Sequence, residues 1–462
     1  MPSRQDQLHS YQFTVQRAVA ALVMRDTDPA QSPFRRLAGA ALAGVLVAAI
    51  GLGGFALYGL FAGGGAKWRD PAVVIVEKES GARFVYRDGR LHPVSNYPSA
   101  LLIIDTEQPR TVLVSRRSIE GVPRGTPLGI ADAPDSLPAP GRLSTTAWTV
   151  CSVVGDDEAA TPRSAVLIGS DPGGGRAAGD DAVLLRHPDG SLHLFWRDRR
   201  HLLRDTDVVL AALATTRARA VPVAPALLNT IPAGADLVPL TLPGLGEPSE
   251  RVADALIGDV YLVRNSGGGV QYAVVDRDGL AGITELQAGL LLARTGQGEP
   301  EAVTLGRFAV LPKLPDLTPT GPSAPPPAPP RLATLDHGGL CLRIGDDTGV
   351  RDVRLDVTLP QLDAVPNPTG HRVQADHVLV APGRGAVVES VAAPGATGGT
   401  LCVVTDLGRR YAVAGPEVLG MLGYRDVRPV RLPAALVSLV PPGSPLDPTA
   451  ARAVTRPADA GR

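Results

Sequence analysis

The sequence has no excess of either charge and is poor in aromatic residues. Its 462 residues include 45 Lys and Arg against 46 Asp and Glu, a formal net charge of −1, so no broad electrostatic attraction to nucleic acid is expected. Aromatic residues make up only 4%, whereas there are 52 glycines and 44 prolines. This composition favours short strands joined by turns over long helices. A hydrophobic fraction of 44% excludes wholesale disorder, and the length suggests about three domains.

The motifs of nucleotide hydrolysis are also missing. A P-loop needs the pattern G-x-x-x-x-G-K-[ST], but neither Lys67 nor Lys313 stands in that context. The glycine-rich stretch 171–175 leads to Asp180 and Asp181, which are acids where a phosphate would need hydrogen-bond donors. The sequence therefore predicts no phosphate-binding loop.

Other chemistry lacks its residues too. No G-x-S-x-G elbow supplies a nucleophile for acyl transfer. His187, His193 and His201 flank one predicted hairpin, without the cysteines or carboxylates that a zinc site requires at matching spacing. We therefore predict no catalytic residue, no cofactor and no metal.

One long uncharged run is present near the start of the chain. Residues 37–62 read LAGAALAGVLVAAIGLGGFALYGLFA, which gives roughly 39 Å of helix against a hydrocarbon core of about 30 Å. The alternatives are a buried core helix and a cleavable signal peptide, but 36 residues precede the run and three glycines follow it. Arg25, Arg35 and Arg36 precede the run, so the positive-inside rule favours a cytoplasmic N-terminus.

The segment before this run is predicted to be an amphipathic helix that starts after Ser3 and ends by Asp28-Pro29. Its apolar residues repeat at helical spacing, at Leu8, Tyr11, Val15, Ala18 and Leu22. A lone helix cannot bury such a stripe, so it must dock on a protein or on the lipid surface. The polar face lacks the Lys and Arg of surface-bound helices, which favours a protein partner.

The region after the membrane segment repeats one small pattern four times. The copies are GARFVYRDGRLHPV from Gly81, GSLHLFWRDRRHLL from Gly190, GVQYAVVDRDGLAGI from Gly269 and GTLCVVTDLGRRYAV from Gly399. Aligned on their aspartates, they place alternating apolar residues on a half-buried strand before a turn, with Phe84, Leu194, Tyr272 and Cys402 at one position. An apolar strand precedes each copy, and a short helix follows, capped for example by Thr206 or Thr284. The recurring Asp residues are interpreted as turn formers rather than catalytic acids.

These patterns predict a mainly β fold with short helices (α+β), consisting of a single N-terminal transmembrane helix and an extracytoplasmic domain with a central module and four small strand-helix repeats. Residues 319–330 contain seven prolines and are predicted to be a stiff extended linker. The expected bounds are 1–36 (cytoplasmic helix), 37–62 (transmembrane helix), 63–110 (repeat 1), 111–170 (first segment of the central module), 171–230 (repeat 2), 231–318 (repeat 3), 319–330 (linker), 331–375 (second segment of the central module), 376–440 (repeat 4) and 441–462 (tail).

The three cysteines all lie in the exported region, where a disulfide is plausible. Three pairings are possible. Cys402 occupies a buried strand position in its repeat, so we interpret it as a core side chain and pair Cys151 with Cys341. Peptide mapping that linked Cys402 to either partner would contradict this assignment.

Several segments together resemble the EccB family of type VII (ESX) secretion systems. They are the leader SRQDQLHSYQFTVQRAVAALVMRD, the single apolar run, IEGVPRGTPLGIADAPDSLPAPGRLSTTAWTVC at 119–151, PGRGAVVES at 382–390 and LVPPGSPLDPTAA at 439–451. The resemblance implies a cytoplasmic helix, one inner-membrane span and a periplasmic domain of a central module and four repeats, bridged by one disulfide. It also implies assembly with EccC, EccD, EccE and the mycosin protease. Members have been labelled ATPases, an activity that we do not transfer because no nucleotide motif is present.

Three hypotheses for the function remain. The first is a structural membrane subunit of the secretion system that scaffolds the complex and oligomerises through its periplasmic domain, without binding nucleic acid. The second is a periplasmic anchor that binds the cell wall, because repeated β-rich units outside a membrane often bind glycans. The third is a nucleotide hydrolase.

Overall fold

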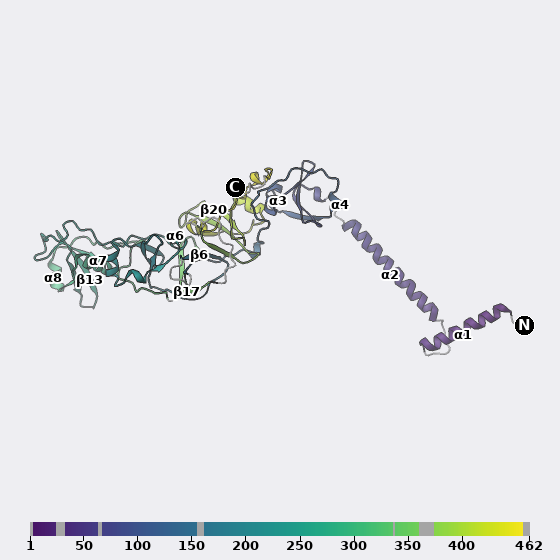
Figure 1. Ribbon diagram of the computed structural model, residues 1–462, viewed down its shortest axis with the longest axis horizontal. Coiled ribbons are helices and arrows are strands. Elements are labelled where there is room, and N and C mark those ends of the chain that lie inside the picture. Colours follow the sequence, from purple (N-terminus) through teal and green to yellow (C-terminus); the bar gives the residue numbers. More distant parts are fainter. Residues whose placement is uncertain are drawn as a thin grey trace. The chain divides into compact units, whose positions relative to one another are not determined.

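The computed structural model describes residues 3–24, 33–62, 67–154, 161–335, 338–359 and 374–455. It divides into two units (Figure 1). The first contains Met1–Asp70 and Val114–Glu120, and the second contains Pro71–Leu113 and Gly121–Arg462. Strands dominate the second unit and form several small sheets, which confirms the mixed, mainly β fold class.

Two long helices make up most of the first unit. Helix α1 (Arg4–Met24) begins after Ser3 as predicted; the Ser3 amide and hydroxyl both donate to the Asp6 carboxylate, at 3.0 and 2.8 Å, in the manner of a capping box. The predicted end at Asp28-Pro29 lies outside the described residues. Helix α2 (Pro33–Ala62) has proline at its first position, where the missing amide costs nothing. Its window Ala38–Phe55 is apolar enough to cross a membrane, and none of it is buried.

Four sheets of four strands each share one topology, in which the third, second, first and fourth strands lie in that order. The first sheet contains β1 (Val73–Glu77), β2 (Arg83–Arg87), β3 (Arg90–Pro93) and β4 (Arg110–Val114). The second contains β8 (Val183–Arg186), β9 (Leu192–Trp196), β10 (Arg199–Leu202) and β11 (Val221–Pro222). The third contains β12 (Val260–Arg264), β13 (Val270–Asp276), β14 (Gly279–Ile283) and β15 (Glu301–Val303). The fourth contains β19 (Ala386–Val391), β20 (Thr400–Val404), β21 (Arg410–Ala412) and β22 (Val430–Pro433).

Each repeat carries two helices, of which the sequence patterns indicated only the first kind. A helix follows the third strand in every repeat: α3 (Tyr97–Ile104), α5 (Thr206–Ala212), α7 (Glu285–Thr295) and α9 (Pro416–Met421). A short helix then follows the fourth strand: α4 (Arg116–Ile119), α6 (Pro225–Thr230), α8 (Leu305–Val310) and α10 (Ala434–Val437). Thr284 caps α7 in a capping box as expected, but the cap of α5 is Asp205 rather than Thr206.

Strand pairing corrects the alignment of the four copies by one residue in repeats 2 and 3. Residues of the second strand are equivalent when they pair with corresponding residues of the first strand. By this criterion the equivalent residues are Phe84, His193, Ala273 and Cys402. Leu194 and Tyr272 are therefore wrong at this position. The aspartates misled the alignment because Asp88 begins its turn, whereas Asp276 ends its strand. Since a one-residue shift moves a side chain to the other face of a strand, the corrected register brings His193 into the buried set.

A returning segment covers the open edge of the third strand in every repeat. Its residues form isolated parallel bridges to that strand: Leu91 with Arg124, Arg200 with Ala233, Leu280 with Lys313 and Arg410 with Pro442. Such cover removes an exposed edge that could pair with other chains. The segments read VPRG, IPAG, LPKL and VPPG, a second repeated motif that entered the sequence-based interpretation only through a family resemblance.

Under this returning segment, one residue of the third strand packs against one residue of the segment, and the repeats differ in which of the two is large. In repeats 1, 2 and 4 a ring on the third strand faces a glycine, in the pairs His92–Gly125, His201–Gly234 and Tyr411–Gly443. In repeat 3 the corresponding pair is Ala281–Leu314, with the bulk on the other partner. A Cβ on Gly443 would lie 2.2 Å from a Tyr411 ring carbon, so only one member of each pair can be large.

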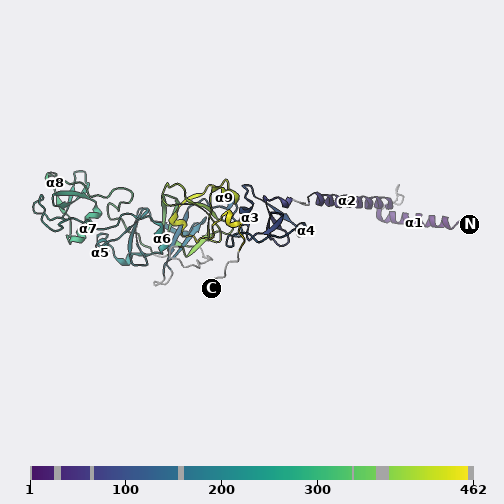
Figure 2. The same ribbon diagram turned by 90° about the horizontal axis from the view of Figure 1, so that it is seen from above.

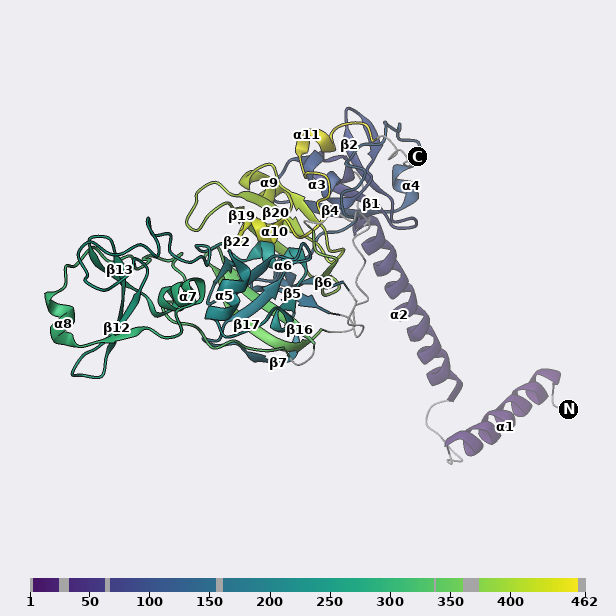
Figure 3. The same ribbon diagram turned by 60° about the vertical axis from the view of Figure 1, so that its left-hand side comes forward.

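A six-stranded sheet forms the central module, in the order β18-β6-β5-β16-β17-β7. Its strands are β5 (Trp148–Val153), β6 (Arg163–Ile168), β7 (Gly173–Ala177), β16 (Gly339–Asp346), β17 (Gly349–Thr358) and β18 (His377–Val380). The bounds predicted from the sequence placed β7 in repeat 2 and β18 in repeat 4, and they placed most of β4 in the central module. In the structure β7 and β18 belong to the central sheet and β4 belongs to the sheet of repeat 1. These bounds were wrong because a strand belongs to the sheet in which it is hydrogen-bonded, and its partners can be distant in the sequence. Figure 3 shows β5, β16 and β17 side by side in this module.

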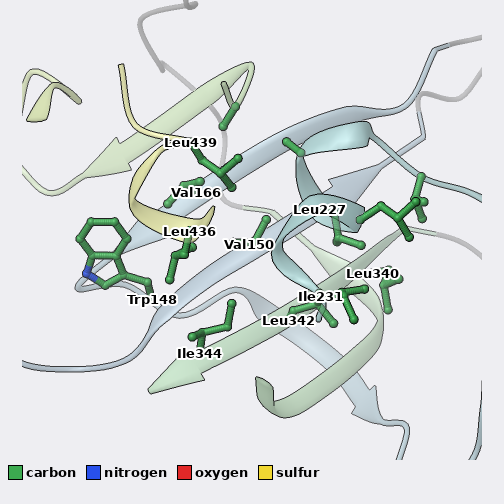
Figure 4. Close-up of a cluster of buried hydrophobic side chains, with 14 of the residues drawn as sticks. Trp148, Val150, Val166, Leu227, Ile231, Leu340, Leu342, Ile344, Leu436 and Leu439 are labelled. Carbon is green, nitrogen blue, oxygen red and sulfur yellow. The ribbon is translucent and has the colours of Figure 1, made fainter. Parts of the chain in front are cut away.

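The main core lies between the central sheet and two of the short helices. Trp148 and Val150 from β5, Leu342 from β16, Leu227 from α6 and Leu436 from α10 all point into it (Figure 4). These side chains are fully or almost fully buried. Burying a side chain of this kind contributes roughly 1.5–3 kcal/mol, so the joint between repeats 2 and 4 and the central module is extensive.

A second core joins the first and last repeats. It includes Val85 and Leu101 from repeat 1 and Val403 and Tyr411 from repeat 4, and α3 lies beside α9 (Figure 2). A segment after repeat 4 adds to it: α11 (Pro448–Ala451) packs on α3, and Val454 forms an antiparallel bridge with Leu128. The last described residues of the chain therefore complete the first repeat.

Candidate functional site

The disulfide lies in the middle of the central sheet. Cys151 on β5 and Cys341 on β16 are directly opposite in register, their Cα atoms are 4.0 Å apart, and their sulfurs are bonded. Both are buried, and the free thiol of Cys402 is buried in repeat 4. The bond closes a separation of 190 residues, for which the chain-entropy model gives about 5 kcal/mol as an upper figure. The bond therefore links two adjacent strands in the middle of the sheet.

The histidines of repeat 2 do not converge on one point. His187 pairs with Asp189 at 2.9 Å, and the ring of His201 bonds the Ala235 carbonyl at 2.7 Å. His193 lies 3.3 Å from the Ser191 hydroxyl, but its Nδ1 has no partner, so this pair lacks the orienting carboxylate of a catalytic triad. No group of three metal-ligating side chains occurs in the portion of the chain that the structure describes.

Burial has a clear electrostatic effect on His193. Its side chain is 6% exposed, and desolvation, helped by the positive charge of Arg200, lowers its pKa to about 4. The ring is therefore neutral at neutral pH. Hydrogen bonds from Ser191 and His187 hold the pKa of Asp189 well below its usual value.

The residues considered for phosphate binding serve structural roles instead. Lys313 donates to the Phe308 and Leu311 carbonyls, and its ammonium lies over the Phe308 ring. Asp181 accepts both guanidinium bonds of Arg331 at 2.7 Å. Lys67 begins a short 3₁₀ helix, η1 (Lys67–Arg69), in the first unit. The structure does not gather these residues into one site.

An ion network that sequence reasoning missed fixes repeat 4 on the central module. Arg431 of β22 contacts Asp347 of the β16–β17 turn at 3.3 Å and Glu389 of β19 at 3.4 Å. Both carboxylates are mostly buried, so Arg431 compensates two charges at once. No local spacing marks this network, because its members come from segments 42 and 84 residues apart.

Two apolar surfaces in the first unit have no partner within the described chain. On α1, Leu8, Tyr11 and Leu22 are 56%, 70% and 83% exposed. Phe13, which lies outside the predicted stripe, is also 59% exposed. On α2, no residue of the window Ala38–Phe55 is buried. Exposed apolar surface of this extent marks contact with a membrane or a protein.

Comparison with known proteins gives a match over nearly the whole chain. Residues 1–456 match the family described as "Type VII secretion system ESX-1, transport TM domain B". The ESX-3 secretion system ATPase EccB3 of Mycolicibacterium smegmatis is 27% identical over 457 residues, which cover 94% of this chain and 87% of the relative. The ESX-2 secretion system ATPase EccB2 of Mycobacterium tuberculosis is 33% identical over 241 residues, about half of each chain (50% and 48%).

Solved structures match as well. A chain in the structure of an intact ESX-5 inner membrane complex aligns with a TM-score of 0.68 and 26% identity, covering 100% of this chain and 98% of that one. The EccB3 dimer from the ESX-3 core complex aligns with a TM-score of 0.66 and 25% identity, covering 82% and 99%. The apolar helix, the small sheets and a family match that extends over residues 1–456 agree, and the chain belongs to the EccB family of type VII secretion systems.

Proposed function

We propose that this protein is a structural membrane subunit of a type VII secretion complex. In this proposal α1 lies in the cytoplasm, α2 crosses the inner membrane, and the second unit stands on the periplasmic side. The observation that carries the proposal is the unburied apolar window of α2. The match to a chain of an ESX-5 inner membrane complex supports it.

Site-specific labelling tests the orientation. Gln12 on α1 and Arg264 on β12 are both exposed, so Gln12→Cys and Arg264→Cys should fold normally. In intact spheroplasts a membrane-impermeant maleimide should label Arg264→Cys at once and Gln12→Cys only after permeabilisation. The native chain is the control, because its described thiols are buried or bonded. Labelling of Gln12→Cys in intact spheroplasts would contradict the proposed orientation.

The partners belong to the same proposal. By family resemblance they are EccC, EccD, EccE and mycosin, together with further copies of this chain, for which the dimer of the EccB3 relative is a precedent. We propose that α1 docks on a cytoplasmic protein rather than on lipid, since Arg4 and Arg17 are the only Lys or Arg side chains in the helix. Tyr11→Glu, in the apolar stripe, should abolish co-purification of the complex. Gln16→Glu, off the stripe with the same charge change, should leave it intact; equal behaviour of the two variants contradicts the docking.

The relatives carry the word ATPase in their names, so hydrolysis needs a direct test. We propose that this chain does not hydrolyse ATP, because no phosphate loop exists in its sequence. Phosphate release should disappear when the purified chain is freed of the secretion motor. Release that persists in that preparation and falls on Lys67→Ala would establish the hydrolase instead.

A further inference from the structure

A cavity of about 430 Å³ lies between repeat 2 and the proline-rich segment. One wall is the β9–β10 hairpin, which supplies Trp196, Arg197, Asp198 and Arg199. The other wall is formed by four prolines between Pro319 and Pro327, together with Gly321 and Ala324. This volume is in the range of small-molecule sites.

The proline-rich wall belongs to the segment predicted to be a stiff extended linker, and backbone hydrogen bonds attach it to two repeats. The Ala235 amide donates to the Ser323 carbonyl at 2.8 Å, and the Leu286 amide donates to the Pro327 carbonyl at 3.2 Å. The segment is therefore tied to repeats 2 and 3. Because proline has no amide hydrogen, this wall offers flat apolar rings and few donors, so the charged groups of the cavity come from the hairpin.

Those charged groups have no polar partner among the described residues. Arg197, Asp198 and Arg199 form no side-chain hydrogen bond or ion pair with the described residues, and the Nε of Arg199 is buried without a partner. Nearby arginines behave differently: Arg204 pairs with a carboxylate at 2.8 Å and Arg331 does so at 2.7 Å. A buried donor without a partner destabilises the protein, and a ligand that accepts a hydrogen bond from the Arg199 Nε would remove that cost.

The hairpin also holds its arginine in a prepared position. The Arg197 guanidinium lies 4.3 Å from the centre of the Trp196 ring, a stacking contact that leaves the N–H edges free for a second partner. The backbone of Arg197 has a φ of +56°. The equivalent residue of repeat 1, Asp88, has a similar φ of +49°. Aspartate tolerates this left-handed backbone better than arginine does. The two-residue turn itself requires this backbone, so the feature particular to Arg197 is a stacked guanidinium that forms no ion pair with the described residues.

The charges define the chemistry of the ligand. Two arginines match one carboxylate group, whose planar oxygens accept paired guanidinium bonds. Asp198 would repel a doubly charged phosphate but can accept from an amide N–H. The proline rings suit small aliphatic groups. We propose that this cavity binds the free carboxylate end of a short peptide with small side chains, held by Arg197 and Arg199 and by an N–H bond to Asp198.

The test uses the full chain in detergent and calorimetric titration with tri-L-alanine. The acid should bind saturably, and its C-terminal amide, which lacks only the charge, should bind at least about tenfold more weakly. Arg199→Gln should weaken binding of the acid by a similar factor. Arg90→Gln, at the equivalent place in repeat 1, is the matched control and should bind like the native chain.

Fluorescence gives an independent readout. Trp68 and Trp148 are buried, whereas Trp196 is half-buried at the cavity, so a signal that follows the acid and vanishes in Trp196→Phe places the peptide there. A parallel titration with L-Ala-D-Ala-D-Ala distinguishes sources of the carboxylate. Preference for the D-ended peptide indicates a cell-wall peptide, and preference for the L-ended one indicates a protein C-terminus. Equal binding of acid and amide, no saturable binding, or native affinity in Arg199→Gln overturns the proposal.

Discussion

Repeat 4 packs a large residue of the third strand on a glycine (Tyr411–Gly443), whereas repeat 3 packs a small one on a leucine (Ala281–Leu314). This difference can be tested by giving repeat 4 the residue pair of repeat 3. Gly443 has an ordinary backbone conformation and a Cβ there would meet the Tyr411 ring at 2.2 Å. Gly443→Leu alone should therefore destabilise repeat 4 by about 1–3 kcal/mol through overpacking, or more if the ring cannot move. Tyr411→Ala alone, at a residue only 1% exposed, should cost about 3–5 kcal/mol through the cavity it leaves.

The double variant reproduces the pair that repeat 3 uses. The leucine then fills much of the space vacated by the ring, so Tyr411→Ala with Gly443→Leu should cost about 1–3 kcal/mol, well below the sum of the single changes. The coupling energy is then on the order of 3–5 kcal/mol, larger than independent sites show. Hydrogen exchange of the β20 and β21 amides in the detergent-solubilised chain measures the opening free energy. Gly141→Leu, where an added Cβ meets nothing within 4 Å, controls for exposed leucine; additive costs would refute the reasoning.

Three further predictions concern single side chains. Folding lowers the pKa of His193 to about 4, from about 6.5 in the unfolded chain. Between these two pH values the unfolded state binds more protons than the folded state. The contribution of His193 to the free energy of unfolding is therefore fully present above about pH 6.5, and about 2 kcal/mol of it is lost at pH 5. His193→Phe should remove that pH dependence in denaturation measured at pH 5 and 7.5, and an unchanged slope would exclude this residue as its source. Non-reducing peptide mapping should link Cys151 to Cys341, with Cys402 alkylated only after denaturation; a linked Cys402 peptide contradicts the pairing. Tyr424→Phe removes a buried 2.7 Å hydrogen bond to a backbone carbonyl and should cost about 0.5–1.5 kcal/mol in the urea midpoint, whereas no change would show that the bond contributes nothing.

Local patterns in the sequence were sufficient for the long helices and the hairpins, but not for the short helix that follows the fourth strand of each repeat. The long apolar run, the cap at Thr284 and the alternation before each turn depend only on residues near in sequence, and the structure has a helix or strand at each place. The register failed by one residue in repeats 2 and 3, because an aspartate can occupy several positions of a turn. Only the pairing with the first strand fixes the equivalence of His193 with Phe84.

Features that depend on distant segments were not predictable in this way. The assignment of β7 and β18 to the central sheet requires knowing which strands pair. The cavity at Trp196 requires the proline-rich segment, more than a hundred residues further on, to return to the hairpin. The second repeated motif could have been found by comparing VPRG with VPPG, since the third residue of each forms the bridge to the third strand.

The bridge between Leu128 and Val454 has a consequence for biosynthesis. Arg452 also pairs with Asp105 at 2.6 Å, across 347 residues of chain, so the first repeat to leave the ribosome obtains its final contacts from residues made much later. Until α11 has been synthesised, the part of repeat 1 that α11 covers remains exposed. A truncation that removed α11 would therefore leave repeat 1, the earliest repeat of the chain, without the contacts that complete it.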